Sequence, residues 1–145
     1  MVDYGEQAVK YFDEGYNCAE STFLALCDAM GKDGKSILTL VTGFGGGMGR
    51  SDSVCGVVSG AIAAIGLKVN RKAPQDGPGK ERVYELVNRF VKEFRQELGA
   101  IDCTSINGFN FATEEGYAQF RAQDRHTTHC APAVKKAVEL AMAIW

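Results

Sequence analysis

The sequence has little of what would place it quickly in a common class of protein. It holds only two histidines and three prolines among 145 residues, and its net charge is -2. A charge this close to neutral gives no electrostatic basis for binding nucleic acid or an anionic membrane. The longest uncharged apolar run, between Asp52 and Lys68, is too short to span a bilayer and is interrupted by glycines. We therefore expect a globular protein that binds no nucleic acid and does not insert into a membrane.

The N-terminal segment lacks the basic flank and the continuous apolar stretch of a secretion signal. It is charged from Asp3 onward. We therefore expect a cytoplasmic protein, in which the reducing environment makes structural disulfides rare. A cysteine in that compartment more often belongs to a core, a metal site or a catalytic site.

The apolar pattern is helical almost throughout, and no alternation is long enough for a convincing strand. The clearest helix carries apolar residues at three- and four-residue steps from Val83 to Leu98. A basic linker, Lys68–Gly79, precedes it. We expect one all-α domain over residues 1–145, a compact bundle of about five to seven helices with a glycine-rich loop. Helices are expected over residues 3–13, 17–31, 54–67, 80–98, 113–124 and 130–144, with shorter helices or turns at 36–41 and 102–106.

Five cysteines are the main chemical feature of the chain, and no two of them form a C-x-x-C pair. This spacing excludes a thioredoxin motif, a zinc ribbon and covalent c-type haem attachment. Four of the five lie where a helix is expected to begin, and they are Cys18, Cys55, Cys103 and Cys130. The unpaired N–H groups at a helix N-terminus favour an anion, so this placement predicts a lowered thiol pKa and a thiolate.

Cys27 differs from the other cysteines. It follows Cys18 by nine residues in one expected helix, which is about two and a half turns, so the two thiols point to opposite sides. Its neighbours one turn away are Phe23, Leu24 and Met30. We therefore expect Cys27 to be a buried, inert core residue.

The segment GFGGGMGR, residues 43–50, resembles a phosphate-binding loop in composition but not in spacing. Phe44 stands where a Walker A motif needs its first glycine, Arg50 replaces the lysine, and Met48 replaces the third glycine of a dinucleotide-binding motif. A tight turn between packed helices is one interpretation. The other is that the glycines adopt positive φ or approach something closely before Cys55, which frees backbone N–H groups to bind thiolates.

Four glycines are candidates for backbone support of a cysteine site, and they are Gly46, Gly47, Gly49 and Gly56. Arg50 is a candidate charge partner for the same site. Ser51, Asp52 and Ser53 are expected to cap the helix that follows.

FGGGMGR followed by CGVVSG, from Cys55 to Gly60, resembles the C_GCAxxG_C_C family of four-cysteine proteins, which are described as redox-active. Cys18 matches the first cysteine of the family, Cys55 the second, and Cys103 and Cys130 the later single ones. Val57 stands in place of the usual alanine, which adds bulk and no chemistry. The resemblance covers essentially the whole chain and implies a single four-cysteine site. A similar domain in split-Soret cytochromes implies that an iron–sulfur cluster is one possible occupant.

Four thiolates suit an iron–sulfur cluster or a closed zinc site. The alternative in the same class has no cofactor and cycles between dithiol and disulfide, with Cys18–Cys55 and Cys103–Cys130 as one of three pairings. Either version implies an unidentified redox partner protein, and the sequence leaves a homodimer open. We expect the four sulfurs to converge and Cys27 to lie apart.

Two functions of other classes remain open. In a cysteine-nucleophile enzyme Cys130 would act with His126 or His129, although adjacent helical residues point about 100° apart, so His129 is poorly placed as its base. In a non-catalytic binding module the basic segment from Lys68 to Arg82 would bind an acidic partner. Whether the protein is an enzyme is therefore open at this stage.

Overall fold

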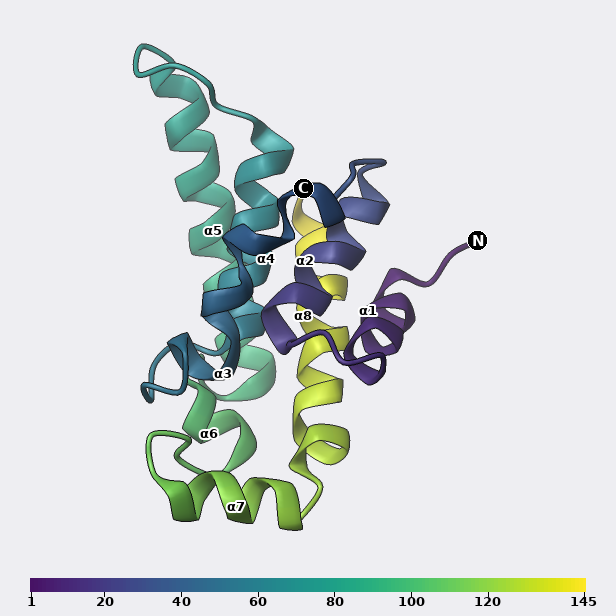
Figure 1. The fold of residues 1–145 in the computed structure, drawn as a ribbon. Coiled ribbons are helices and arrows are strands. Elements are labelled where there is room, and N and C mark those ends of the chain that lie inside the picture. Colours follow the sequence, from purple (N-terminus) through teal and green to yellow (C-terminus); the bar gives the residue numbers. More distant parts are fainter.

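The computed structural model describes all 145 residues and is helical almost throughout (Figure 1). The all-α prediction is confirmed, since the only β-type pairing is an isolated bridge between Val54 and Asp102. The α-helical segments are α1 (Tyr4–Asp13), α2 (Cys18–Ala29), α3 (Gly45–Met48), α4 (Gly56–Val69), α5 (Gly77–Leu98), α6 (Cys103–Asn107), α7 (Glu114–Ala122) and α8 (Ala131–Ile144). Short 3-10 turns cover Lys35–Leu40 and Thr42–Phe44, and a π-helical turn covers His126–Cys130.

The helices outnumber the five to seven that we expected. The difference arises in the glycine-rich loop and in the segment before α8, both of which form short helical turns of their own. No helix is long and apolar enough to cross a membrane.

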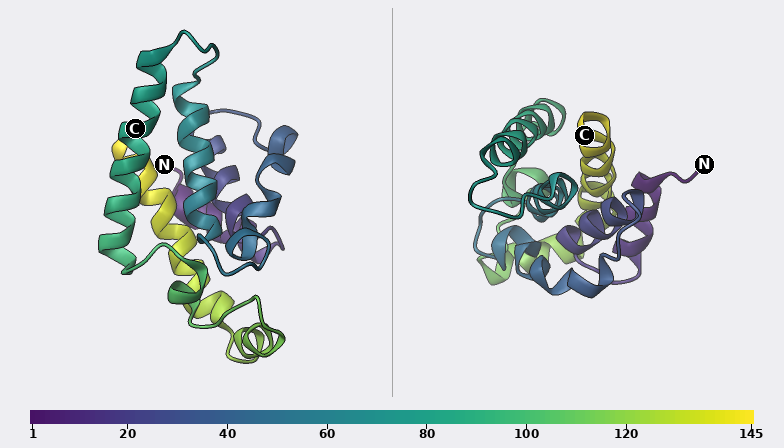
Figure 2. Two further views of the ribbon diagram at one scale, coloured as in Figure 1. Left: turned by 90° about the vertical axis from the view of Figure 1, so that its left-hand side faces the viewer. Right: turned by 90° about the horizontal axis from the view of Figure 1, so that it is seen from above.

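Helix α8 packs against α1, α2, α4 and α5, and α2 and α4 also pack directly against each other (Figure 2). One cluster of buried side chains joins all five, with Ala8, Leu24, Val58, Phe90 and Val138 each contributed by a different helix. Helices α6 and α7 lie together at one end of this bundle (Figure 1). The site described below lies between that end and the bundle.

The linker between α4 and α5 is shorter than the expected Lys68–Gly79. Helix α4 continues to Val69, and α5 begins at Gly77, where the Asp76 side chain accepts a hydrogen bond from the N–H of Gly79. Pro78 lies in the first turn of α5, where its missing N–H has no helical partner to lose. Pro78 therefore belongs to the start of this helix, whereas Pro74 lies in the linker before it.

Small residues bring α4 close to α2. A Cβ atom added at Gly60 would lie 2.5 Å from the carbonyl oxygen of Ala19, which is a backbone atom. Ala19 itself is fully buried. The second turn of α4 can therefore approach the first turn of α2 closely only because residue 60 has no side chain.

We expect Gly60→Ala to destabilise the protein by about 1–3 kcal/mol, because the new methyl group overlaps the backbone of α2. Gly66→Ala in the same helix is the matched control, since a Cβ there meets no atom within 4 Å. That change should stabilise by about 0.5–1 kcal/mol through helix propensity alone. Urea unfolding of both variants measures the difference, and equal effects of the two changes would contradict the close contact at Gly60.

Candidate four-cysteine site

A cavity of about 510 Å³ lies where α2, α3, α4, α6, α7 and the start of α8 meet. Four of the five cysteines line it, and they are Cys18, Cys55, Cys103 and Cys130. Cys27 is absent from the lining and is fully buried in the hydrophobic core, as expected. The structure thus brings the four candidate thiols to one cavity from four separate segments of the chain.

Cys18 is the first residue of α2, and a capping box fixes the start of that helix. The Asn17 side chain accepts a hydrogen bond from the Glu20 N–H at 2.8 Å, and the Glu20 carboxylate accepts one from the Asn17 N–H at 2.9 Å. Both side chains also hold the glycine-rich loop, because Asn17 donates to the carbonyl of Thr42 and Glu20 accepts from the Thr42 hydroxyl. The capping box that places Cys18 therefore also ties the loop to it.

Backbone N–H groups surround the sulfur of Cys18. Hydrogen bonds from the backbone of Gly46, Ala19 and Gly56 favour its thiolate. A Cβ atom added at Gly56 would lie 2.5 Å from the same sulfur. Gly46 and Gly56 thus act as the expected backbone support, one as a donor from the loop and the other as a donor that also leaves room for the sulfur.

Cys55 and Cys103 are held side by side by a short antiparallel bridge. The N–H of Cys55 donates to the carbonyl of Ile101 at 2.8 Å, and the N–H of Cys103 donates to the carbonyl of Ser53 at 2.9 Å. Cys55 caps α4 and Cys103 begins α6. The helix-start prediction is therefore confirmed for these two cysteines and for Cys18.

The glycine-rich loop forms one turn of left-handed helix. Every residue from Gly46 to Arg50 has a φ between 63° and 72°. Successive N–H groups donate four residues back, from Gly49 to Gly45 at 2.9 Å and from Arg50 to Gly46 at 3.1 Å. A left-handed turn costs about 1–2 kcal/mol for each residue that has a side chain, so glycine is needed at most of these positions. Met48 and Arg50 are strained here.

Gly47 lies against Cys103. A Cβ atom added at Gly47 would lie 2.6 Å from the Cβ of Cys103, and the φ of Gly47 is +72°. Gly47 therefore supports the site by letting the left-handed turn pack onto α6. Gly49 has a φ of +67° and meets only the Gly43 carbonyl, at 3.9 Å, so its contribution is the backbone conformation alone.

Asn107 is a site residue that sequence reasoning missed. It is fully buried, and its Nδ2 donates to the sulfur of Cys103 at 3.3 Å and to the Cys103 carbonyl. Its position four residues after Cys103 could have indicated this contact, because residues four apart on a helix lie on the same face. Asn107 orients the Cys103 thiol and favours its charged form.

The thiol pKa values are opposite to the sequence prediction. Burial raises the pKa of all four cavity thiols, to about 12 for Cys103 and Cys130, and raises that of Cys55 well above its usual value. The neighbouring cysteines raise the pKa of Cys55 further, because each thiolate would repel the next. The helix N-termini and N–H donors lower these values too little to overcome the loss of water.

Cys130 is not at a free helix N-terminus, which corrects the sequence prediction. Its backbone is helical, and it ends a π-helical turn that runs directly into α8. The two histidines of this segment are otherwise engaged. His126 lines the cavity and stacks on Phe12 with ring centroids 3.7 Å apart, and the ring nitrogens of His129 pair with Arg125 and Thr128.

The cavity rim contains one charged side chain, that of Arg50, which lies over the Tyr117 ring. Ser51, Asp52 and Ser53 do not cap α4, contrary to expectation, since Cys55 is the cap residue and no side chain bonds there. Asp52 instead accepts a hydrogen bond from the Thr104 hydroxyl at 2.5 Å. It therefore ties the end of the loop to α6.

The donor atoms of the cavity are thiols, and all five cysteines are free. No group of three or more His, Cys, Asp or Glu side chains is placed to share a single metal ion. The four thiols line one cavity, and no three of these side chains are placed around a single ion.

Comparison with known proteins agrees with the four-cysteine pattern. The family described as "Putative redox-active protein (C_GCAxxG_C_C)" matches residues 16–144. A relative from Archaeoglobus fulgidus, described as an uncharacterized protein, is 34% identical over 108 residues, which cover 70% of this chain and 72% of the relative. No solved structure matches the chain.

Proposed function

This chain belongs to the C_GCAxxG_C_C family, which is described as "Putative redox-active protein", and on that premise we propose that Cys18, Cys55, Cys103 and Cys130 hold an iron–sulfur cluster for electron transfer. The observation that carries the proposal is the common cavity, which four cysteines from distant segments line. Cys27, in contrast, is buried in the hydrophobic core and does not line the cavity.

The donor set fits a cluster better than a single ion. Zinc in a closed site needs four ligands within about 2.3 Å of one point, and no such group is preformed here. In a four-iron cluster each cysteine binds a different iron, so the sulfurs stay apart around a larger body. We favour the cluster because four thiols line one cavity of about 510 Å³ while no three side chains are placed around a single ion.

The surroundings of the sulfurs also fit a cluster. Backbone N–H groups near Cys18 and the Asn107 amide near Cys103 supply hydrogen bonds to thiolate sulfur. Such bonds stabilise the negative charge of a thiolate-bound cluster and tune its potential. A cluster bound here would supply one-electron transfer, and the chain's own residues bind it, exclude water and offset its charge. This role requires a redox partner protein.

Disulfide cycling fits the cavity less well. A thiol that attacks a disulfide must be accessible and in large part ionised. Cys55 and Cys103 are buried, and burial raises the pKa of all four cavity thiols. A bound metal cation would offset the cost of ionising several buried thiols together, which favours a metal-containing site over disulfide cycling.

The nucleophilic-enzyme alternative has even less support from the geometry. A cysteine nucleophile needs a base within hydrogen-bonding reach. The His129 ring pairs with Arg125 and Thr128, and the His126 ring is stacked on Phe12. No hydrogen bond joins either histidine to Cys130, although His126 lines the same cavity.

Reduction of the iron-reconstituted protein tests the redox function. We expect dithionite to bleach its visible absorption and subsequent oxidation to restore it, because a thiolate-bound cluster changes oxidation state reversibly. The metal-free protein, treated in parallel, should show no visible change. An iron-loaded protein whose spectrum does not respond to the reductant would contradict electron transfer at this site.

A further inference from the structure

We propose that the cavity also binds a small organic carboxylate beside the thiols, with Arg50 as its anchor and aromatic side chains as its walls. The cavity of about 510 Å³ lies within the range of small-molecule sites, roughly 300–1,000 Å³. Most of its lining residues are hydrophobic, and a few polar groups converge among them. This is the usual composition of a pocket for an organic ligand.

The charge of the lining favours an anion. Arg50 is the only lining residue with a full positive charge, and no aspartate or glutamate lines the cavity. Arg50 takes part in none of the ion pairs of the protein. Its guanidinium donates to the Tyr117 hydroxyl at 3.0 Å and lies 4.2 Å from the centre of that ring. Tyr117 thus orients the charge without neutralising it.

The backbone conformation of Arg50 also supports a role for this residue in the site. Arg50 has a φ of 64°, the left-handed conformation that residues with side chains rarely adopt. The conformation costs about 1–2 kcal/mol, and such strain persists mainly where a site requires it. The strained turn places a planar, permanently charged group on the cavity rim, where it can bind a carboxylate through two hydrogen bonds.

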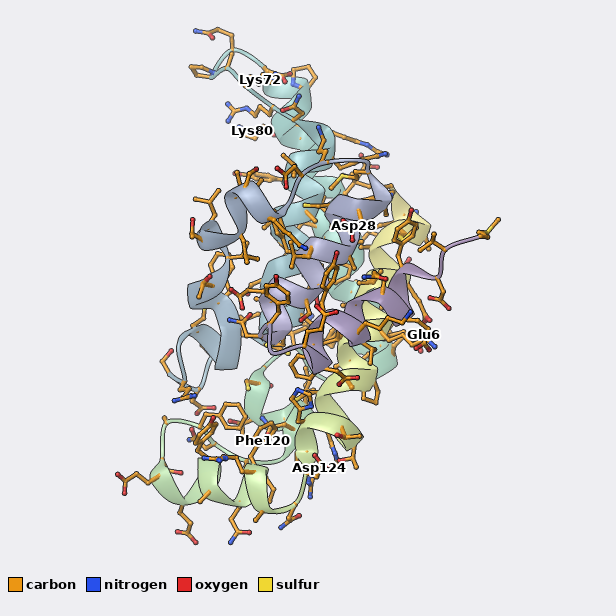
Figure 3. All side chains as sticks on the ribbon, turned by 45° about the vertical axis from the view of Figure 1, so that its right-hand side comes forward. Glu6, Asp28, Lys72, Lys80, Phe120 and Asp124 are labelled. Atoms are coloured by element: carbon orange, nitrogen blue, oxygen red, sulfur yellow. The ribbon has the colours of Figure 1, made fainter.

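Aromatic side chains make up much of the remaining wall. Phe111 contacts Tyr117 and Phe120 with ring centroids 5.4 Å and 4.6 Å apart. Phe120 is on the side of α7 that faces the rest of the molecule (Figure 3), and its side chain lines the cavity. Another part of the lining is the stacked pair of Phe12 and His126. Flat apolar surfaces of this kind favour a ligand with a flat apolar body over an inorganic anion.

Arg50 and the aromatic wall would form the carboxylate site without the thiols, so the metal-free protein is sufficient to test it. A thiolate-bound cluster would take up part of the same cavity and add negative charge to it, so benzoate should bind the metal-free protein at least as well as the iron-reconstituted one. The further claim that the bound carboxylate lies beside a redox centre rests on the proposed function. The two proposals can therefore fail separately, since iron content reports on the first and carboxylate affinity on the second.

Titration of the ¹⁵N-labelled full-length protein with benzoate, followed by NMR, tests the carboxylate site. We expect saturable shifts of the Gly46, Arg50 and Tyr117 amides. Benzamide, the neutral analogue, should bind roughly tenfold more weakly, because it lacks the charge that Arg50 recognises. Arg50→Gln should weaken benzoate binding by a similar factor, and Arg50→Lys by less.

Arg121→Gln is the matched control. Arg121 lies 6.0 Å from the same Tyr117 ring but is exposed and outside the cavity lining. We expect this variant to bind benzoate like the wild type, and melting curves show whether each variant is folded. Three results would overturn the proposal: equal binding of benzamide, an equal loss in the Arg121 variant, or displacement of benzoate by phosphate at the same concentration. Absence of benzoate binding to both metal-free and iron-reconstituted protein would also overturn it.

Discussion

Replacing any one of Cys18, Cys55, Cys103 and Cys130 by alanine is expected to remove most of the iron and the visible absorption of the reconstituted protein. Loss of a residue that merely hydrogen-bonds a metal ligand weakens metal binding by about 10–100-fold. Loss of the ligand itself should therefore reduce iron retention by more than about tenfold. Iron analysis after gel filtration under anaerobic conditions measures the effect.

Cys27→Ala is the control for this series. Cys27 is fully buried in the core and outside the cavity. Its removal leaves a small void that costs stability and no ligand. We expect that variant to keep its iron and spectrum. If it lost iron as completely as the other four, or if two of the four cavity variants retained it fully, the four-ligand assignment would be wrong.

Gly47→Ala is expected to abolish cluster retention while the chain still folds. The new methyl group would lie 2.6 Å from the Cβ of Cys103, and it would also strain a residue at a φ of +72°. The strain costs about 1–2 kcal/mol, and the overlap adds about 1–3 kcal/mol by forcing Cys103 out of place. Circular dichroism with iron analysis separates folding from loss of the site.

Gly49→Ala separates the strain from the overlap. Gly49 has a φ of +67°, close to that of Gly47, but a Cβ there meets only a carbonyl oxygen at 3.9 Å. This variant should lose about 1–2 kcal/mol of stability and keep its iron. If both alanine variants retained equal amounts of iron, the contact between the left-handed turn and Cys103 would have no role in the site.

Local sequence patterns predict the helices better than they predict the site. The apolar stripe of α5 is a short-range feature and appears as expected, and the start of α2 is likewise fixed by two residues three positions apart, Asn17 and Glu20. The start of α5 was placed too late because Pro78 suits either a linker or a first helical turn. The Asp76 side chain decides between them, because it caps the helix by accepting a hydrogen bond from the Gly79 N–H; aspartate before a first-turn proline is a helix-start signal that our prediction did not use.

Sequence patterns did not predict how far the left-handed turn extends. The glycines indicated positive φ, but Met48 and Arg50 adopt it as well. Residues with side chains do so only when the surrounding structure imposes it. The family resemblance indicated the four cysteines, and neither spacing nor composition alone showed that they line one cavity.

The direction of the thiol pKa shifts was wrong because it was argued from local position alone. A helix N-terminus lowers a thiol pKa, but burial among other thiols raises it by more. Burial depends on the packing of segments far apart in the chain. The same holds for the aromatic wall, since Tyr117 and Phe120 on α7 lie far in sequence from Arg50.

The iron, acid-labile sulfide and zinc contents of anaerobically purified protein test the central claim most directly. A thiolate-bound cluster predicts iron and sulfide in equal amounts, broad visible absorption and little zinc, because clusters contain both elements. Colourless protein that contains one equivalent of zinc, or that remains metal-free after incubation with iron and sulfide under reducing conditions, would contradict the proposed iron–sulfur centre.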